Sequence, residues 1–236
     1  MKRTGVIGCG LVLACMLVTV WGLRSYAAPQ SAGKWMPLFN GKNLDGWKPY
    51  GQETWKADHG TIFGESTSGK YGYLVTDKTY KDFDVRLKFN CTMEGNSGLF
   101  FHSQITGENP KWGPDIEGLQ AEIDPARHSG GIYESGGRGW VALPTAEGEK
   151  AIKPVGQWNT MEVRVEGNHI VTHLNGVEIV DYTYTPAKYT DGHIALQIHT
   201  GQHGFRVRFK DIEIRTTSLT EGPAGSATVL RDGRFY

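Results

Sequence analysis

Cysteine is scarce in this sequence, and its scarcity excludes one way of stabilising a fold. The 236 residues contain three cysteines, of which Cys9 and Cys15 fall within the first apolar segment. If that segment is removed, Cys91 is alone and no intramolecular disulfide can form, even in an oxidising compartment. The core must therefore be held together by packing.

The chain also lacks an excess of charge of either sign. It contains 25 Lys and Arg residues against 25 Asp and Glu residues, and without residues 1–27 it has 22 basic against 25 acidic side chains, a net charge of about −3. A nucleic-acid-binding domain usually carries a basic patch or stripe. We therefore expect no nucleic-acid partner.

Long apolar runs are missing everywhere except near the amino terminus. There, Lys2 and Arg3 precede an apolar run over residues 5–23, and residues 25–27 (Ser-Tyr-Ala) form a small-x-small cleavage site. This pattern is typical of a secretory signal peptide. We expect residues 1–27 to be removed and the mature protein to be exported to the periplasm or the extracellular space.

Two alternatives would keep the protein at a membrane. Residues 12–15 (Val-Leu-Ala-Cys) resemble a lipobox, which would make Cys15 the lipidated residue of a lipoprotein, although residues 16–23 stay apolar where a lipoprotein normally has a polar tether. The apolar run also approaches the roughly 20 residues that a spanning helix requires. A membrane partner is expected only if the chain is lipid-anchored or keeps its signal.

After residue 28 no stretch has a sustained apolar period of 3.6 residues, which excludes a long helix. Glycine, by contrast, makes up 32 of the 236 residues, about twice the usual share of roughly 7%. Glycines punctuate short β-rich runs, and Gly167-Asn168 and Asn175-Gly176 mark two tight hairpins. The runs cover residues 54–63, 82–90, 97–103, 119–124, 160–166, 169–174, 177–182, 193–199 and 205–214. We predict one all-β domain over residues 28–215, a two-sheet antiparallel sandwich, followed by a surface tail over residues 216–236.

One predicted strand places polar side chains at every second position. Gln120, Glu122 and Asp124 alternate with leucine, alanine and isoleucine at positions 119, 121 and 123. Successive side chains of a strand point to opposite faces, so the three polar groups share one face. A face with two carboxyl groups and an amide predicts the floor of a sugar-sized cleft.

Two further runs carry polar side chains in the same alternation. One places His102 on a face with Gly98 and Phe100, and the other places Gln197 and His199 on one face. Beside the acidic strand, these groups could bind sugar hydroxyls, hold a divalent ion or move protons. The alternative is a solvated outer face, but such a face is usually rich in Lys, Thr and Ser.

A glycine-rich loop follows the acidic strand and adds candidates for binding. Arg138 offers a donor fork for an oxyanion or for hydroxyls, and Trp140 and Trp112 could each stack on a pyranose ring. The alternative is an ordinary hairpin in which Arg138 pairs with Glu134.

One enzymatic interpretation fails on the sequence itself. Laminarinase-like glycosidases use a Glu-x-Asp-x-(x)-Glu strand whose outer carboxylates serve as nucleophile and acid. Here Glu122 and Asp124 begin the pattern, but residues 125–128 are Pro-Ala-Arg-His. Direct retaining hydrolysis by this strand is therefore not expected.

Seven motifs follow one another along the chain. They are LFNGKNLDGW at residues 38–47, NSGLFFH at 96–102, GLQAEID at 118–124, GGIYESGGRGW at 130–140, GQWNTMEV at 156–163, LNGVEI at 174–179, and GHIALQIHTG at 192–201 with FKDIEIR at 209–215. In this order they resemble the motifs of the 3-keto-disaccharide hydrolase family. The resemblance covers residues 35 to about 215 and implies a concanavalin A-like jelly roll with its site on the concave face. His102 departs from the pattern, because many members have arginine there.

The resemblance also implies a chemistry, the cleavage of a glycoside that is already oxidised at carbon 3 of the sugar. The carbonyl acidifies the proton on carbon 2, a base removes it, and the substituent on carbon 1 leaves from the enolate; water can then add. The implied catalytic residues are Glu122, His199, Arg138, Asp124 and Tyr133. The implied substrate-binding residues are Gln120, Gln197, His102, Trp112, Glu134 and Trp140.

Within this set the implied roles overlap. Glu122 or His199 would be the base, and Asp124 or Tyr133 would lie near the leaving group. Arg138 and His102, or a divalent metal ion such as calcium, would hold the enolate oxygen; no other cofactor is implied.

Two classes without catalysis would use the same hairpins. A carbohydrate-binding module would favour aromatic platforms over a cluster of histidine, glutamate and arginine. A structural or adhesive jelly roll of the laminin G type would need only the hairpins, with a calcium site at its rim. The Gln, Glu and His faces favour the enzyme, with a carbohydrate as its substrate.

Overall fold

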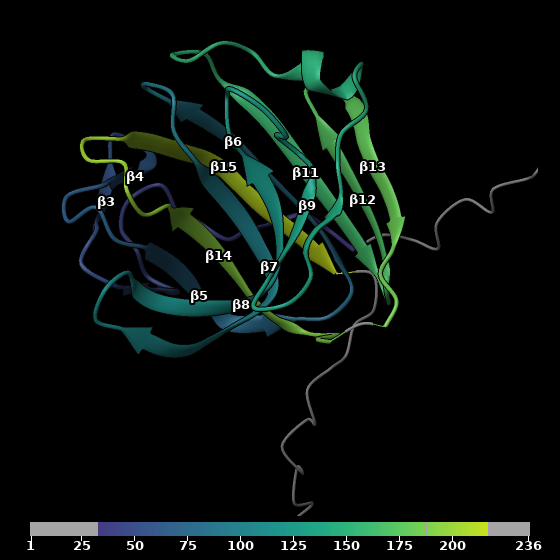
Figure 1. Ribbon diagram of the computed structural model, residues 1–236, viewed down its shortest axis with the longest axis horizontal. Helices are drawn as coiled ribbons and strands as arrows, with labels where there is room; N and C mark the ends of the chain where they lie inside the picture. Colours follow the sequence, from purple (N-terminus) through teal and green to yellow (C-terminus); the bar gives the residue numbers. More distant parts are fainter. Residues whose placement is uncertain (1–32, 187, 217–236) are drawn as a thin grey trace, which may run out of the picture. The chain divides into compact units, whose positions relative to one another are not determined.

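The computed structural model describes residues 33–216 apart from residue 187, and these residues form two antiparallel β-sheets (Figure 1). The predicted signal peptide lies outside the described residues, as does the predicted tail after Thr216. One short 3₁₀ helix, η1, covers Gly148–Ala151. Within the described part of the chain, no helix has the length and apolarity needed to cross a membrane.

The first sheet, sheet A, contains the two hairpins predicted from the sequence. Its strands are, in sheet order, β13 (Val177–Thr183), β12 (His169–Leu174), β11 (Asn159–Glu166), β6 (Phe83–Cys91), β15 (Arg206–Thr216), β4 (Thr61–Glu65) and β3 (Thr54–Asp58), and β1 (Met36–Pro37) pairs with β15. Gly167 joins β11 to β12, while Asn175 and Gly176 join β12 to β13, all with positive φ. Both hairpins are therefore confirmed.

The second sheet, sheet B, positions the candidate site. Its strands are, in sheet order, β10 (Gly139–Ala142), β9 (Ile132–Ser135), β8 (Gly113–Ile123), β7 (Ser97–Asn109), β14 (Gly192–Ile198), β5 (Gly72–Tyr80) and β2 (Trp47–Tyr50). The two-sheet antiparallel jelly roll is thus confirmed. The sequence did not predict β1, β2, β5, β9 or β10. The run predicted as one strand over residues 54–63 is two strands, because His59 and Gly60 form a turn with positive φ.

The core lies between the sheets and takes one face from each. Phe89 and Phe209 of sheet A and Leu99 and Leu196 of sheet B belong to one cluster of buried apolar side chains. Full burial of such a side chain contributes about 1.5–3 kcal/mol. Cys91 is free and buried in the same cluster, and burial raises the pKa of its thiol to about 12, so packing is its role.

The hairpin between β7 and β8 extends past its neighbours and folds toward β5. We call residues 104–117 the β7–β8 arm. Register shifts after Phe101 and after Ile105 bend it, and the backbone N–H of Tyr71 donates to the carbonyl of Trp112 at 2.8 Å. Gly113 fits this close approach, because its φ is 90° and a Cβ there would lie 2.8 Å from the Tyr71 carbonyl oxygen. The arm thereby forms a wall over the outer face of sheet B.

Candidate active site

The outer face of sheet B carries a row of aligned positions across four strands. Glu122 of β8 is paired with Gly98 of β7, Gly98 with Gln197 of β14, and Gln197 with Tyr73 of β5. Directly paired residues of antiparallel strands point to the same face, so these side chains gather on one surface. Gln120 lies two residues before Glu122 and shares that face.

Gly98 gives the polar side chains of this row their space. A Cβ at position 98 would lie 2.5 Å from Gln120 Nε2. Without it, the Gln120 amide lies across β7 and donates to Glu122 Oε2 at 2.6 Å and to the Ser97 carbonyl oxygen at 3.3 Å. The glycine of the NSG motif is therefore part of the site.

Above this row lies a pocket of about 420 Å³, which is within the usual range for small-molecule sites. Gln120, Glu122 and Gln197 form its floor. The β7–β8 arm supplies one wall through residues 114–116, and the β8–β9 connection supplies the other through Arg127. Seven residues predicted from the sequence line the pocket: Gln120, Glu122, Asp124, Tyr133, Trp140, Gln197 and His199.

Glu122 is the most perturbed acid of the pocket. Its side chain is almost fully buried, with Gln120 bonded to Oε2 and the Asn96 amide donating to Oε1. Burial raises the pKa of Glu122 to about 8, the nearby Asp124 carboxylate adds to the rise, and Asn96 and Arg127 oppose it. This carboxyl group therefore exchanges its proton near neutral pH.

His199 follows the end of β14 and is held in one tautomer. Its Nδ1 lies 2.9 Å from the Thr200 carbonyl oxygen, which can only accept, so Nδ1 carries the hydrogen. Nε2 then accepts from the Tyr71 hydroxyl at 3.1 Å. Burial raises the pKa of Tyr71, with Tyr133 and Glu122 adding to the rise, so this phenol keeps its proton at neutral pH.

Trp140 forms an aromatic rim for the pocket. Its ring meets His128 edge to face at a centroid distance of 5.1 Å and Tyr133 at 5.4 Å, yet 40% of its surface stays exposed. Glu149 Oε1 lies 2.7 Å from His128 Nδ1 and fixes that ring. A rigid indole with an open side is suited to stack on a sugar ring.

Arg127 supplies the cation of the pocket. Among the described residues that line it, Arg127 carries the one guanidinium, and no lysine is present. The side chain is exposed in the connection that follows Asp124. Its donors are therefore available to an anionic oxygen of a ligand.

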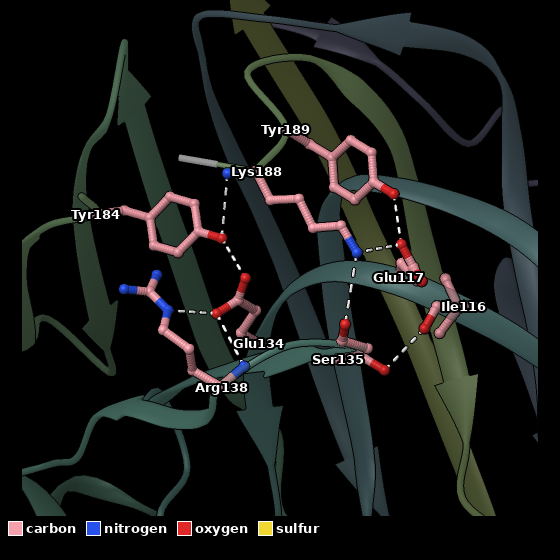
Figure 2. A network of polar contacts seen from close by, with 9 residues as sticks. Ile116, Glu117, Glu134, Ser135, Arg138, Tyr184, Lys188 and Tyr189 are labelled. Atoms are coloured by element: carbon pink, nitrogen blue, oxygen red, sulfur yellow. Dashed lines mark hydrogen bonds and ion pairs between the residues drawn. The ribbon is translucent and has the colours of Figure 1, made fainter. Parts of the chain in front are cut away.

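Arg138, which was predicted to hold the enolate oxygen, lies beside Glu134 and Tyr184 and not in the pocket lining (Figure 2). Its Nε donates to Glu134 Oε2 at 2.5 Å, and its guanidinium lies over the Tyr184 ring at 4.4 Å. Tyr184 donates to the other oxygen of Glu134. Glu134 is paired with core-facing Leu119, so this cluster lies on the opposite face from Glu122. The structure therefore agrees with the alternative interpretation, a hairpin in which Arg138 pairs with Glu134. Neither residue lines the pocket.

Two other predicted residues also lie outside the pocket lining. Alternation predicted that His102 shares a face with Phe100. In the structure His102 lies in the bulge after Phe101 and has a φ of 45°. Its ring packs edge-on against the core residue Phe83, at a centroid distance of 5.9 Å. The predicted placement was wrong, because a bulge breaks the period of two. Trp112 is exposed on the β7–β8 arm beside the pocket.

Several lining residues were not predicted as site residues: Tyr71, Tyr73, Asn96, Asp115, Arg127, His128 and Ser135. The alternation of Tyr71 and Tyr73 was a usable signal, as was the position of Arg127 directly after the acidic strand. Within residues 33–186 and 188–216, no group of three or more His, Cys, Asp or Glu side chains is arranged to hold a metal ion.

Comparison with known proteins gives a family match and a set of similar folds. Residues 34–215 match the model of a 3-keto-alpha-glucoside-1,2-lyase-like domain. A curated 3-keto-disaccharide hydrolase of Bacteroides thetaiotaomicron is 24% identical over 190 residues, which cover 72% of this chain. The match spans 65% of the length of that relative.

Solved structures with similar folds include one named as a hydrolase and a carbohydrate-binding module. A Parabacteroides distasonis protein named as a glycosyl hydrolase has a TM-score of 0.57 at 22% identity, covering 78% of this chain and 94% of that one. A carbohydrate-binding module of Bacillus subtilis has a TM-score of 0.56 at 14% identity, covering 72% of this chain and 96% of that one. At these identities the likeness concerns the fold alone.

Proposed function

Because this chain belongs to the family of 3-keto-alpha-glucoside-1,2-lyase-like domains, we propose that its pocket cleaves 3-keto-glycosides by elimination across carbons 1 and 2, followed by addition of water. The observation that carries the proposal is Glu122. This buried carboxyl group lies on the pocket floor, has a pKa raised to about 8, and has both oxygens held by amide donors. Amide donors suit the ionised form, and the raised pKa makes that form a stronger base than an ordinary carboxylate.

In the first step, ionised Glu122 takes the proton from carbon 2. The electrons of that C–H bond form a double bond between carbons 2 and 3, and the negative charge moves to the oxygen on carbon 3. Arg127 is the cation of the pocket and lies near Glu122, as its effect on the Glu122 pKa indicates. We assign Arg127 to stabilise the enolate oxygen, because preorganised donors at a developing charge are a large catalytic term.

In the second step, the carbonyl on carbon 3 re-forms, a double bond forms between carbons 1 and 2, and the bond from carbon 1 to the leaving oxygen breaks. The leaving oxygen needs a proton. Tyr71, hydrogen-bonded to His199, is the assigned source. Water then adds its oxygen to carbon 1 and passes one proton to the Tyr71 phenolate. Carbon 2 takes a proton from Glu122, whose carboxyl proton has exchanged with solvent, so both residues are restored and the free 3-keto sugar is released. None of these steps is routed through a metal ion.

The order of these groups across sheet B supports this assignment. Arg127 belongs to the connection between β8 and β9, Glu122 lies on β8, and His199 follows β14, two strands away from β8. Two strand spacings are about 10 Å. Carbon 2 lies between carbons 3 and 1 in the sugar, as Glu122 lies between Arg127 and His199 in the pocket.

The proposal predicts how activity depends on pH. The base is active only when ionised, so kcat/KM should fall about tenfold for each pH unit below about 8 and level off above it. A pH profile on an aryl 3-keto-glucoside measures this. If Glu122 instead delivered a proton, kcat/KM would fall as the pH rises through about 8, and the assigned role would be reversed.

A second candidate function is carbohydrate binding without catalysis. The exposed Trp140 at the pocket rim favours it, because an aromatic platform alone suffices to hold a sugar. Incubating the protein with an aryl 3-keto-glucoside separates the two. Release of the aglycone supports the enzyme, whereas binding of intact glycans with no release from any 3-keto-glycoside supports the binding module.

A further inference from the structure

The β7–β8 arm carries a carboxyl group that the proposed chemistry does not use. Asp115 is half-buried and lines the pocket. Its Oδ1 accepts from the Trp112 indole N–H at 2.7 Å, which orients the carboxylate. Pro114 and Ile116 flank it in the same wall. Asp115 therefore borders the pocket from a fixed position on the arm, outside the row of aligned residues that contains Glu122.

Carboxyl groups outnumber guanidinium and ammonium groups in the described lining of the pocket. Asp115, Glu122 and Asp124 contribute three carboxyl groups, whereas Arg127 contributes the one guanidinium among the lining residues that the structure describes. Arg127 lies in the β8–β9 connection, and Asp115 lies on the arm that packs on the residues before β5. When the enolate oxygen occupies Arg127, no second guanidinium and no ammonium group of the described lining remains for another negative group.

We propose that Asp115 is a specificity-determining residue that selects neutral, hydroxyl-bearing 3-keto-glycosides over 3-keto-uronides. The inference rests on the proposed function. A carboxylate oxygen accepts hydrogen bonds from sugar hydroxyls, so Asp115 favours a neutral sugar at its end of the pocket. The same oxygen repels a carboxylate there, and repulsion in a partly desolvated pocket discriminates between substrates that differ in one charged group.

The test compares two substrates that differ only at carbon 6, a 4-nitrophenyl 3-keto-glucoside and the corresponding 3-keto-glucuronide. Wild-type protein should have a kcat/KM at least about tenfold higher on the neutral substrate, and Asp115→Asn should reduce this ratio several-fold, mainly by improving the acidic substrate. Rising ionic strength should also reduce the wild-type ratio, because salt screens the repulsion. Asp77→Asn, the same change at an exposed position of β5, should leave the ratio unaltered.

An equal ratio in wild type and Asp115→Asn would overturn the inference, and so would a wild-type preference for the uronide. If Asp115→Asn fails to fold, Asp115→Ser provides the second variant. If wild type cleaves neither substrate, the proposed function fails first. The selectivity is then measured as binding of methyl glucoside against methyl glucuronide by NMR titration, and equal affinities would overturn it.

Discussion

Replacing Glu122 with glutamine should lower kcat on an aryl 3-keto-glucoside by about 10²- to 10⁴-fold, with a smaller change in KM. The amide cannot take the proton from carbon 2, and loss of a positioned acid or base has an effect of this size. The variant differs from wild type by one hydrogen-bonding group, so shape and burial are kept. Steady-state kinetics on purified protein measure the effect.

The same variant should fold well, and its stability gives an independent check. Buried Asn96 Oδ1 has no hydrogen-bond partner within the described residues, so a rotated Asn96 amide can accept from the new side chain. The raised pKa of Glu122 means that the folded protein loses stability as pH rises from about 4.5 through about 8. Glu122→Gln should remove that loss, so its melting temperature should fall less than that of wild type between pH 6 and pH 9.

Glu178→Gln is the matched control, because Glu178 is exposed on β13 of the other sheet. It should keep wild-type kinetics and the wild-type dependence of melting temperature on pH. If Glu122→Gln retains full turnover, the enzyme class can stand, but Glu122 is not its base.

Replacing Arg127 with methionine should lower kcat by about 10²- to 10³-fold, the usual effect of removing one donor at a developing oxyanion. Methionine keeps much of the length of the side chain and removes its charge. Arg127→Lys should recover part of the loss, because the cation returns without the donor fork. Single-turnover rates on the same substrate measure this step apart from product release.

Arg138→Met is the informative comparison for Arg127→Met. Arg138 holds buried Glu134, so its loss should lower the melting temperature while leaving the pocket cation in place. We therefore expect Arg127→Met to lower kcat and Arg138→Met to lower the melting temperature. A larger loss of turnover in Arg138→Met at a temperature where both variants are folded would return the enolate role to Arg138.

The sequence predicted what depends on local alternation. Gln120 and Glu122 share a face because side chains alternate along one unbroken strand, and the same holds for the placement of Gln197. The hairpin at Asn175 and Gly176 likewise follows from two adjacent residues that tolerate positive φ. These features need no knowledge of distant segments.

The sequence could not settle what distant segments decide. Arg127 and Arg138 both follow the acidic strand, and the pairing of Arg138 with Glu134 is reinforced by Tyr184, 50 residues away from Glu134. His102 turns inward at a bulge, which has no clear signal in the alternation. Tyr71 reaches the site because the β7–β8 arm folds back on it.

The central claim is that cleavage begins with removal of the proton on carbon 2. It is tested most directly by letting the protein cleave an aryl 3-keto-glucoside in D₂O and locating deuterium in the released sugar by NMR, against a control in which the product is incubated without protein. Elimination followed by addition of water predicts one deuterium at carbon 2, incorporated at the rate of aglycone release. In Glu122→Gln, aglycone release and deuterium incorporation should slow by the same factor. Release of a sugar that keeps its original hydrogen at carbon 2 would contradict the account.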